Sequence, residues 1–147
     1  MAHVRKSIRD NVTTTLTGLA TTGANVYQTR FYPLAEAKVA GLCIYTNSED
    51  VEYTTLSLPR TQMRSLEVMV EAYVKGTANI DDTLDTIAVE ISEALAVDVT
   101  RGGKAKDTKV TRFEATYAGE GDQPVGVGSF TVEVLYATLE NDLETAV

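Results

Sequence analysis

The stretch from Ser65 to Gly76, SLEVMVEAYVKG, constrains the fold more than any other part of the chain. Aliphatic and mostly polar side chains alternate along it, and the aliphatic set is Leu66, Val68, Val70, Ala72 and Val74. Because successive side chains of a strand point to opposite faces, this period of two predicts a strand with one buried and one polar face. If continuous to Lys75, the strand would span roughly 35 Å at about 3.3 Å per residue, which is unusually long.

The composition suits one folded domain that covers residues 1–147. The chain is 44% hydrophobic and 23% charged, so it can build a core and is not disordered by composition. No apolar run is long enough to span a bilayer, and the N-terminus has positive charge without an apolar stretch behind it. We therefore expect a soluble protein that is made inside the cell.

The net charge of −8 is placed unevenly along the chain. Residues 1–74 carry seven basic and seven acidic side chains, whereas residues 75–147 carry six basic and fourteen acidic ones. Contact with nucleic-acid phosphates needs clustered Lys and Arg, so this balance argues against nucleic-acid binding. It would suit a surface past which DNA slides without adhering.

Two amphipathic helices are predicted from apolar residues that recur every three or four positions. The first covers residues 3–19 and ends near Gly18 and Gly23. The second covers residues 79–95, where Asn79 or Asp81 can cap the first turn and acidic residues suit the helix dipole. Its expected buried stripe is Leu84, Ile87, Ile91, Ala94 and Leu95.

The remaining segments alternate between strand and turn patterns. Besides the long central strand we expect strands at 26–27, 37–46, 108–118 and 130–138. Turns or loops are expected at 47–50, 100–107 and 119–129, an exposed excursion at 51–59, and a frayed acidic tail at 139–147. Together these elements predict an α+β fold, with a mostly antiparallel sheet and two main helices packed on one face.

Residues that could carry catalysis or hold a metal are scarce. His3, the sole histidine, is expected to be a solvated terminal residue, and Cys43, the sole cysteine, a small packing residue. These two residues cannot supply the four ligands of a zinc site. Asp81, Asp82 and Asp85 are better explained by the helix dipole than by a cation. The glycines of GGKAKD and GEGDQPVGVG lack the spacing or context of nucleotide-binding loops. We predict no catalytic, cofactor or metal site, and no enzyme.

Two groups of residues are candidates for contacts in an assembly. Arg101, Lys104 and Lys106 form the one concentrated basic segment, which is either a solvated loop or a loop that meets an acidic neighbour. The second group lies on the polar face of the long strand and consists of Glu67, Met69, Glu71 and Tyr73. Surface or interface charges explain Glu67 and Glu71 better than a catalytic carboxylate pair does.

The order of these segments resembles that of the tail terminator proteins of long-tailed bacteriophages, the lambda-type minor tail protein U family. The resemblance rests on VRKSIRDNVTTTL, VYQTRFYPLAEAKVAGLCIYT, SLEVMVEAYVKG, IDDTLDTIAVEISEAL and GSFTVEVLYAT, and it covers nearly the whole chain. It is a resemblance of pattern and order, without an invariant signature. It implies an α+β structural protein of the virion without catalytic residues, made in the host cytoplasm.

The resemblance also implies partners. Such proteins form a hexameric ring on the head-proximal end of the finished tail tube, stop the addition of tube subunits and present the tail to the head–tail connector protein. DNA later passes through the ring without specific binding, and no membrane is involved. Six copies would carry about −48, because each chain carries −8, and this charge would discourage DNA from adhering to the channel wall.

Two other readings stay open. The chain could be a head–tail connector or tail-completion protein of the neck, in which case tails made without it would have normal length but would not join heads. It could instead be a small-ligand-binding or enzymatic α+β domain. A deep pocket that places Tyr27, Tyr45 or Tyr73 beside Arg30 or Arg64 would favour that third reading.

Overall fold

The computed structural model describes residues 2–28, 40–75, 79–118 and 125–147. Within these ranges, two helices and six strands follow in the order α1 (Val4–Leu16), β1 (Val26–Tyr27), β2 (Ala40–Tyr53), β3 (Thr61–Lys75), α2 (Ile80–Ala96), β4 (Asp107–Ala118), β5 (Val125–Leu139) and β6 (Asp142–Ala146). The start of the strand expected at 37–46, the first part of the turn expected at 119–129, and Arg30 lie outside the described residues.

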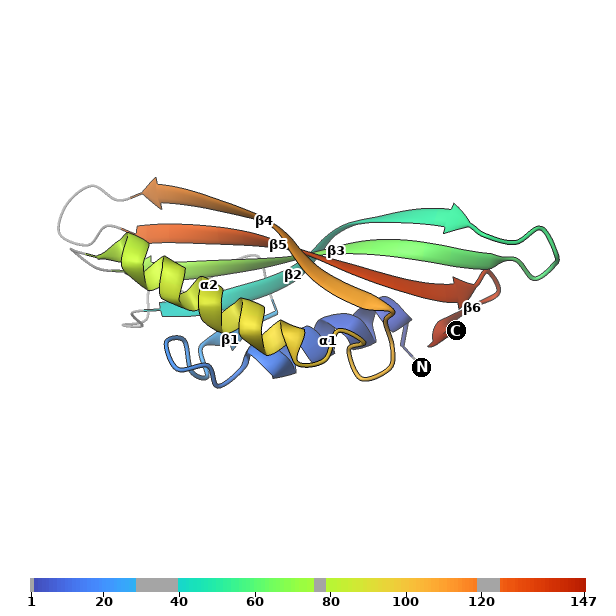
Figure 1. Cartoon of the computed structure of the whole chain (residues 1–147), viewed down its shortest axis with the longest axis horizontal. Coiled ribbons are helices and arrows are strands. Elements are labelled where there is room, and N and C mark those ends of the chain that lie inside the picture. Colours follow the sequence, from blue (N-terminus) through green and yellow to red (C-terminus); the bar gives the residue numbers. More distant parts are fainter. Residues whose placement is uncertain (1, 29–39, 76–78, 119–124) are drawn as a thin grey trace.

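All six strands belong to one sheet, in the order β1-β2-β3-β5-β4, with β6 paired to β5. Only β1 and β2 are parallel, and the other neighbours are antiparallel. Both helices lie on the same side of this twisted sheet (Figure 1). The predicted α+β class, with a mostly antiparallel sheet and two helices on one face, is confirmed.

The long central strand β3 has the predicted alternation over its full length. Its even-numbered residues from Gln62 to Val74 are buried, and its odd-numbered residues are half-buried. Val70 lies opposite Phe130, and Val68 opposite Val132, on the neighbouring strand β5. The predicted apolar faces of the two strands are therefore confirmed, and they form the centre of the core.

The two helices cover this apolar face. The buried stripe of α1 is Val4, Ile8, Val12 and Leu16, and that of α2 is Leu84, Ile87, Ile91 and Leu95, whereas Ala94 is only half-buried. Two glycines of β5 let α2 and β4 approach closely. A Cβ on Gly126 would lie 2.2 Å from Ile80 Cγ2, and one on Gly128 would lie 2.9 Å from Phe113 Cε1.

Asn79 sits at the N-cap of α2 as expected, but it has a left-handed backbone and its side chain makes no capping hydrogen bond.

Three boundaries differ from the sequence expectation. The turn expected at 47–50 is wrong, because β2 runs through it to Tyr53 with a bulge between Thr46 and Ser48 that absorbs the extra residue. The turn expected at 119–129 is wrong for its last five residues, which begin β5. The tail from 139 does not fray, because Asp142–Ala146 form β6 on the end of β5.

The sheet continues beyond the two helices at one end, where β2 and β3 form a long hairpin (the right-hand end of Figure 1). We call residues 50–63, which make up the end of this hairpin and its turn, the arm. The exposed excursion that we expected at 51–59 is confirmed, because these residues are all exposed and lie at the end of this hairpin. The arm lies at the end of the sheet where β5 and β6 also meet.

Candidate functional site

The helix-free side of the sheet gathers polar side chains from neighbouring strands. On β3 it carries Ser65, Glu67, Met69, Glu71 and Tyr73, all half-buried. The strand register places Glu67 opposite Ser48 of β2 and opposite Glu133 of β5. We call this surface the polar face. It consists of these five residues of β3, of Ser48 and Asp50 of β2, and of Ser129, Thr131 and Glu133 of β5.

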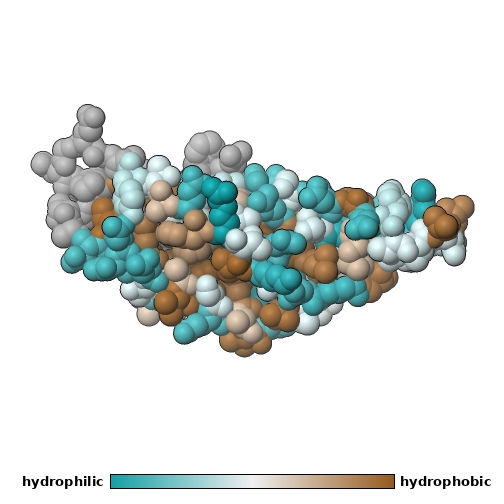
Figure 2. All heavy atoms as spheres, turned by 45° about the horizontal axis from the view of Figure 1, so that its top comes forward, coloured by the Kyte–Doolittle hydropathy of each residue, from teal (hydrophilic) through white to brown (hydrophobic). Residues whose placement is uncertain are grey.

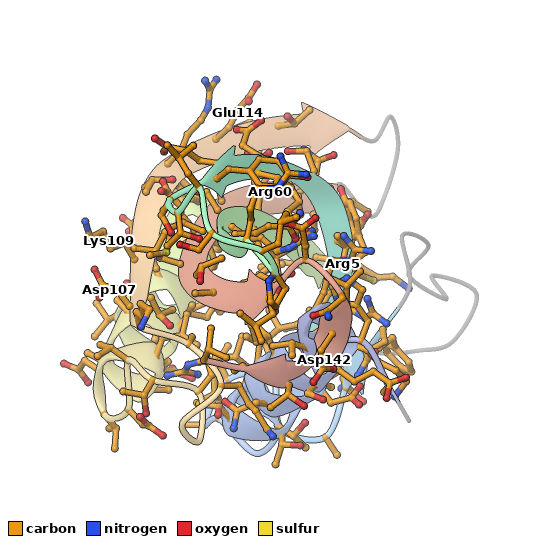
Figure 3. All side chains as sticks on the ribbon, turned by 90° about the vertical axis from the view of Figure 1, so that its right-hand side faces the viewer. Arg5, Arg60, Asp107, Lys109, Glu114 and Asp142 are labelled. Carbon is orange, nitrogen blue, oxygen red and sulfur yellow. The ribbon has the colours of Figure 1, made fainter. Side chains whose placement is uncertain are left out.

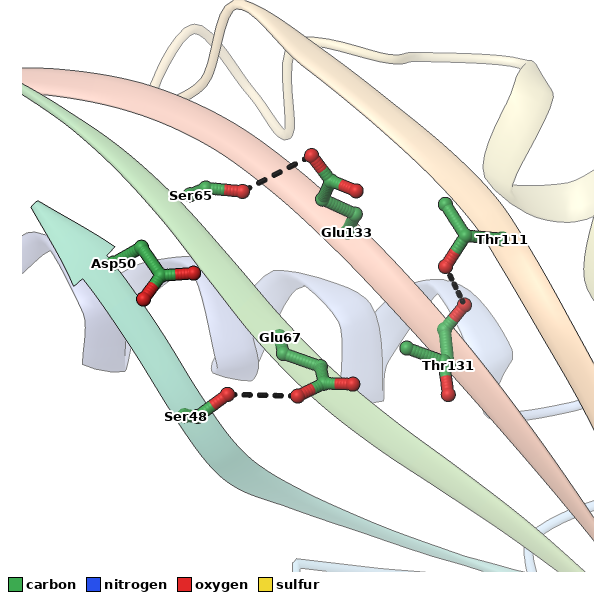
Figure 4. Close-up of a pocket in the computed structure, with 7 residues that line it drawn as sticks. All are labelled: Ser48, Asp50, Ser65, Glu67, Thr111, Thr131 and Glu133. Atoms are coloured by element: carbon green, nitrogen blue, oxygen red, sulfur yellow. Dashed lines mark hydrogen bonds between the residues drawn. The ribbon is translucent and has the colours of Figure 1, made fainter.

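A shallow hollow of about 210 Å³ lies on the polar face, lined by Ser48, Asp50, Ser65, Glu67, Thr111, Thr131 and Glu133 (Figure 4). Three of these seven residues are carboxylates and none is a cation. The hollow therefore repels phosphates and carboxylates, and it has no positively charged side chain that could bind an anion.

The carboxylates of the hollow are held by their neighbours. Ser48 Oγ donates to Glu67 Oε2 at 2.7 Å, and Asn47 Nδ2 donates to the same oxygen at 3.0 Å. These two hydrogen bonds hold the pKa of Glu67 below its ordinary value, because they stabilise its charged form. Ser65 Oγ donates to Glu133 Oε1 at 3.0 Å. The face is therefore negatively charged at neutral pH.

The structure brings the predicted contact residues of β3 together on this polar face. Ser129 Oγ donates to Glu71 Oε2 at 3.4 Å, and Thr131 Oγ1 lies 3.6 Å from Met69 Sδ. Burial raises the pKa of Tyr73 to about 12. A contact between these residues and another chain stays a prediction.

Arg101 does not belong to an exposed basic loop, and its assignment as an assembly contact is wrong. Its side chain is only 1% exposed. Its Nη2 donates to the carbonyl of Leu95 at 2.6 Å and also to the carbonyl of Asp98. It therefore caps the C-terminal end of α2, where free carbonyls attract a cation. An arginine shortly after the last buried leucine of the helix was the signal that could have indicated this role.

Lys104 and Lys106, in contrast, are exposed. This exposure fits both alternatives, a solvated loop and a loop that contacts another chain. The predicted basic segment is thus reduced to two lysines.

A buried polar network lies where the arm begins. The sequence does not indicate it, because the composition of Asn47–Asp50 predicts a turn at Glu49. Glu49 Oε1 accepts from Arg64 Nη1 at 2.6 Å and from Arg5 Nη1 at 3.1 Å, and Glu49 Oε2 accepts from Tyr136 at 2.6 Å. The side chains of Arg64 and Glu49 are 9% and 6% exposed. Burial, helped by the bond to Glu49, raises the pKa of Tyr136. The network joins α1, β2, β3 and β5.

This network separates Arg64 from the tyrosines of the third reading. Arg64 lies on the helix-bearing side, whereas Tyr73 and Tyr45 lie at positions of β3 and β2 that face the other side. Arg64 therefore does not form the expected pocket with Tyr45 or Tyr73.

The two residues considered for catalysis have structural positions. His3 is not a solvated end, because its Nδ1 accepts the backbone N–H of Arg5 at 3.0 Å and caps α1. Its desolvation lowers its pKa. Cys43 is fully buried, which confirms it as a packing residue, and burial raises its pKa to about 11. Over the described ranges, no group of three or more His, Cys, Asp or Glu residues could hold a metal ion.

The tip of the arm is apolar and exposed. Leu56 and Leu58 are 96% and 80% exposed, and brown spheres mark this end of the molecule in Figure 2. The base of the tip is fixed, because Arg60 Nε donates to Glu140 Oε2 at 2.6 Å and the Arg60 guanidinium lies 4.7 Å from the Tyr53 ring centroid. A fixed apolar tip is typical of a contact surface.

Comparisons with known proteins find similarity to solved structures. No family model matches the chain, and no curated protein matches it. A solved chain described as "Virion of native gene transfer agent (GTA) particle" is 14% identical, and the match covers 90% of this chain and 95% of that chain with a TM-score of 0.46. A likeness of this size carries no functional argument. None of the helices in the described ranges is both long and apolar enough to cross a membrane.

Proposed function

We propose that this chain is a structural protein of a phage-like virion, a tail terminator whose ring caps the head-proximal end of the tail tube. The single observation that carries the proposal is the acidic polar face, which the two helices leave uncovered. The resemblance of the sequence to the tail terminator family supports it from an independent direction. The role is structural rather than enzymatic.

An acidic sheet face suits the wall of a channel through which DNA passes. Asp50, Glu67, Glu71 and Glu133 spread over three neighbouring strands. Packing this face against an identical face would bring like charges together, whereas water in a channel keeps each carboxylate solvated. Carboxylates on the wall would repel DNA phosphates and let the duplex slide. In this proposal Glu67 and Glu71 belong to the channel wall rather than to a contact between subunits.

A ring also needs two unlike surfaces on each subunit, because every subunit meets its neighbours head to tail. The two edges of the sheet differ in this way, since β1 and the part of β2 beyond its pairing with β1 form one side and β4 forms the other. The apolar tip of the arm, with Leu56 and Leu58, offers a third surface for the tail tube or the connector.

Addition of the purified protein to polymerising tube subunits tests the proposal. Tubes should stop growing when the protein is added, and it should be found at one tube end by gold labelling. Unchanged tube length together with restored joining of heads to tails would identify a connector instead. Unchanged tube length without any effect on head–tail joining would contradict both the tail terminator and the connector hypotheses.

A further inference from the structure

We infer that His3 is a pH-sensitive switch. In mild acid its imidazole takes up a proton from the solvent, the first turn of α1 opens, and the base of the arm loosens. The step is a reversible protonation of Nδ1, and no other bond forms or breaks in it. This inference concerns the single chain and does not depend on the proposed function.

His3 caps α1 with a ring nitrogen that must be free of a proton. Its Nδ1 accepts the backbone N–H of Arg5 at 3.0 Å, which is the side-chain hydrogen bond of the N-cap. Ser, Thr, Asp and Asn are preferred at this position, and their oxygens accept at every pH near neutrality. An imidazolium ion has two N–H donors and no acceptor. Protonation of Nδ1 therefore removes the cap.

The charges of the first turn of α1 also oppose a protonated His3. This turn contains no acidic residue, although carboxylates stabilise the positive end of a helix dipole. The residues that follow in it include Arg5 and Lys6, which are both cations. A charged His3 would add a third cation at this end. Loss of the acceptor and gain of the charge act on the turn in the same direction.

Three charged side chains act on His3 from the elements around it. They are Arg5 of α1, Glu49 of β2 and Arg64 of β3, so two cations face one carboxylate. Desolvation, with Arg5 as the next cause, lowers the pKa of His3 below its ordinary value of 6.5. Glu49 acts in the opposite direction with less effect. The surroundings therefore favour the neutral imidazole that the cap requires.

Three further elements, β1, β6 and α2, pack against α1. Asp142 and Glu144 of β6 are exposed, so solvent screens their charges. Glu90 of α2 accepts from Thr21 Oγ1 at 2.6 Å, beyond the other end of α1. The remaining titratable residues of β1 and α2 are Tyr27, Asp81, Asp82, Asp85 and Glu93. The charges around Glu49 are therefore the ones that set the protonation of His3.

The switch reaches the arm through Arg5 and Glu49. The backbone of Arg5 belongs to the cap, and its Nη1 donates to Glu49 Oε1 at 3.1 Å. Arg64 and Tyr136 hold the same carboxylate, each at 2.6 Å. Glu49 directly precedes the arm and Arg64 directly follows it. Arg5 and the start of α1 lie at the end of the molecule from which the arm extends (Figure 1 and Figure 3). Opening of the first turn therefore withdraws one of the three donors that fix Glu49.

The direction of the pH effect follows from the lowered pKa of His3. Below its ordinary value of 6.5 the unfolded chain binds this proton more readily than the folded chain does. The contribution of the cap to stability is therefore present above pH 6.5 and is lost as the pH falls through the lowered folded pKa.

Two variants separate capping from protonation. His3→Asn keeps an acceptor at the N-cap that cannot take up a proton near neutral pH, whereas His3→Ala has no acceptor. Because His3 is the sole histidine, proton NMR of the chain without a histidine tag follows its imidazole as a single signal. This signal should titrate with a midpoint below 6.5, and the amide of Arg5 should shift with the same midpoint.

Hydrogen exchange measured by mass spectrometry tests the link to the arm. At about pH 7.5 the wild type and His3→Asn should exchange alike, because both are capped. At about pH 5.5 the wild type should exchange at least about threefold faster than His3→Asn in residues 4–8 and 49–64, and it should approach His3→Ala. Comparison at one pH removes the intrinsic effect of pH on exchange. Residues 87–95 of α2 are the internal control and should exchange alike in the wild type and His3→Asn.

Three results would overturn the inference. The first is equal exchange of the wild type and His3→Asn at both pH values, and the second is an imidazole midpoint at or above 6.5. The third is faster exchange of the first turn with an unchanged arm, since the arm would then not respond to His3. None of these results bears on the capping of tubes, so the proposed function is tested separately.

Discussion

The helix-covered part of the sheet and the arm use the same two strands in opposite ways. Under the helices, β3 buries Leu66, Val68 and Val70. Toward the arm, the same side of β3 carries Arg64 and Gln62. Both are buried, but they make side-chain hydrogen bonds where the core residues make apolar contacts. At the tip, Leu56 and Leu58 are exposed. The strand period is constant, and the change of residue type shows where the core ends and where a contact surface begins.

The largest effect is expected at the centre of the covered part. Val70→Asp places a charge without a partner in the core, and we expect the loss of more than about 4 kcal/mol of unfolding free energy. Met69→Gln, on the neighbouring half-buried position of the polar face, is the matched control and should cost under about 1.5 kcal/mol. Thermal unfolding measures both. Equal melting temperatures for the two variants would show that the assigned strand faces are wrong.

A substitution that breaks the polar network at the base of the arm should lower the unfolding free energy nearly as much as Val70→Asp does. Glu49→Ala removes the carboxylate that Arg64 and Arg5 share, and a buried arginine left without its partner costs about 3 kcal/mol. Asp50→Ala, one residue further on the polar face, should change the unfolding free energy by less than about 0.5 kcal/mol. Denaturant unfolding compares them. Similar values would mean that the network does not anchor the arm.

The buried thiol of Cys43 should make a smaller contribution to stability, and this contribution depends on pH. The pKa of Cys43 is raised in the folded state from its ordinary value of 9.0 to about 11. The unfolded chain therefore releases this proton first, and stability present below pH 9 is lost as the pH rises toward 11. Cys43→Ala should reduce this alkaline loss. An identical pH profile for the variant and the wild type would contradict the assigned burial.

The smallest effect is expected at the tip. Leu56→Ser together with Leu58→Ser should change the unfolding free energy by less than about 0.5 kcal/mol, because both side chains are already in water. Leu66→Ala, on the covered part of β3, should cost about 2–5 kcal/mol. Thermal unfolding separates the two regions, and a large loss in the tip variant would indicate that the arm folds back on the core.

Strong periodicity explains which parts of the fold were predicted. The apolar faces of β3 and β5 and the stripes of both helices follow directly from side-chain spacing. The continuation of β2 through Asn47–Asp50 was missed because a polar strand end has the composition of a turn. Strand β6 was missed because only its pairing with β5 orders it.

The candidate site was predicted in part for a similar reason. The polar face follows from the alternation of β3, so Glu67 and Glu71 were placed correctly on one surface. The buried role of Arg101 depends on the carbonyls of Leu95 and Asp98, which lie only six and three residues before it at the end of α2. It was missed because the basic composition of the segment was interpreted as an exposed loop. The network around Glu49 joins residues that are far apart in the sequence, and no local pattern indicates such a partnership.

The length of tails in particles assembled with and without this protein tests the central claim most directly. Electron microscopy measures it. The account predicts overlong tails without heads when the protein is absent, and tails of uniform length when it is supplied. Tails of normal length in its absence would contradict the claim that the chain terminates a tail tube.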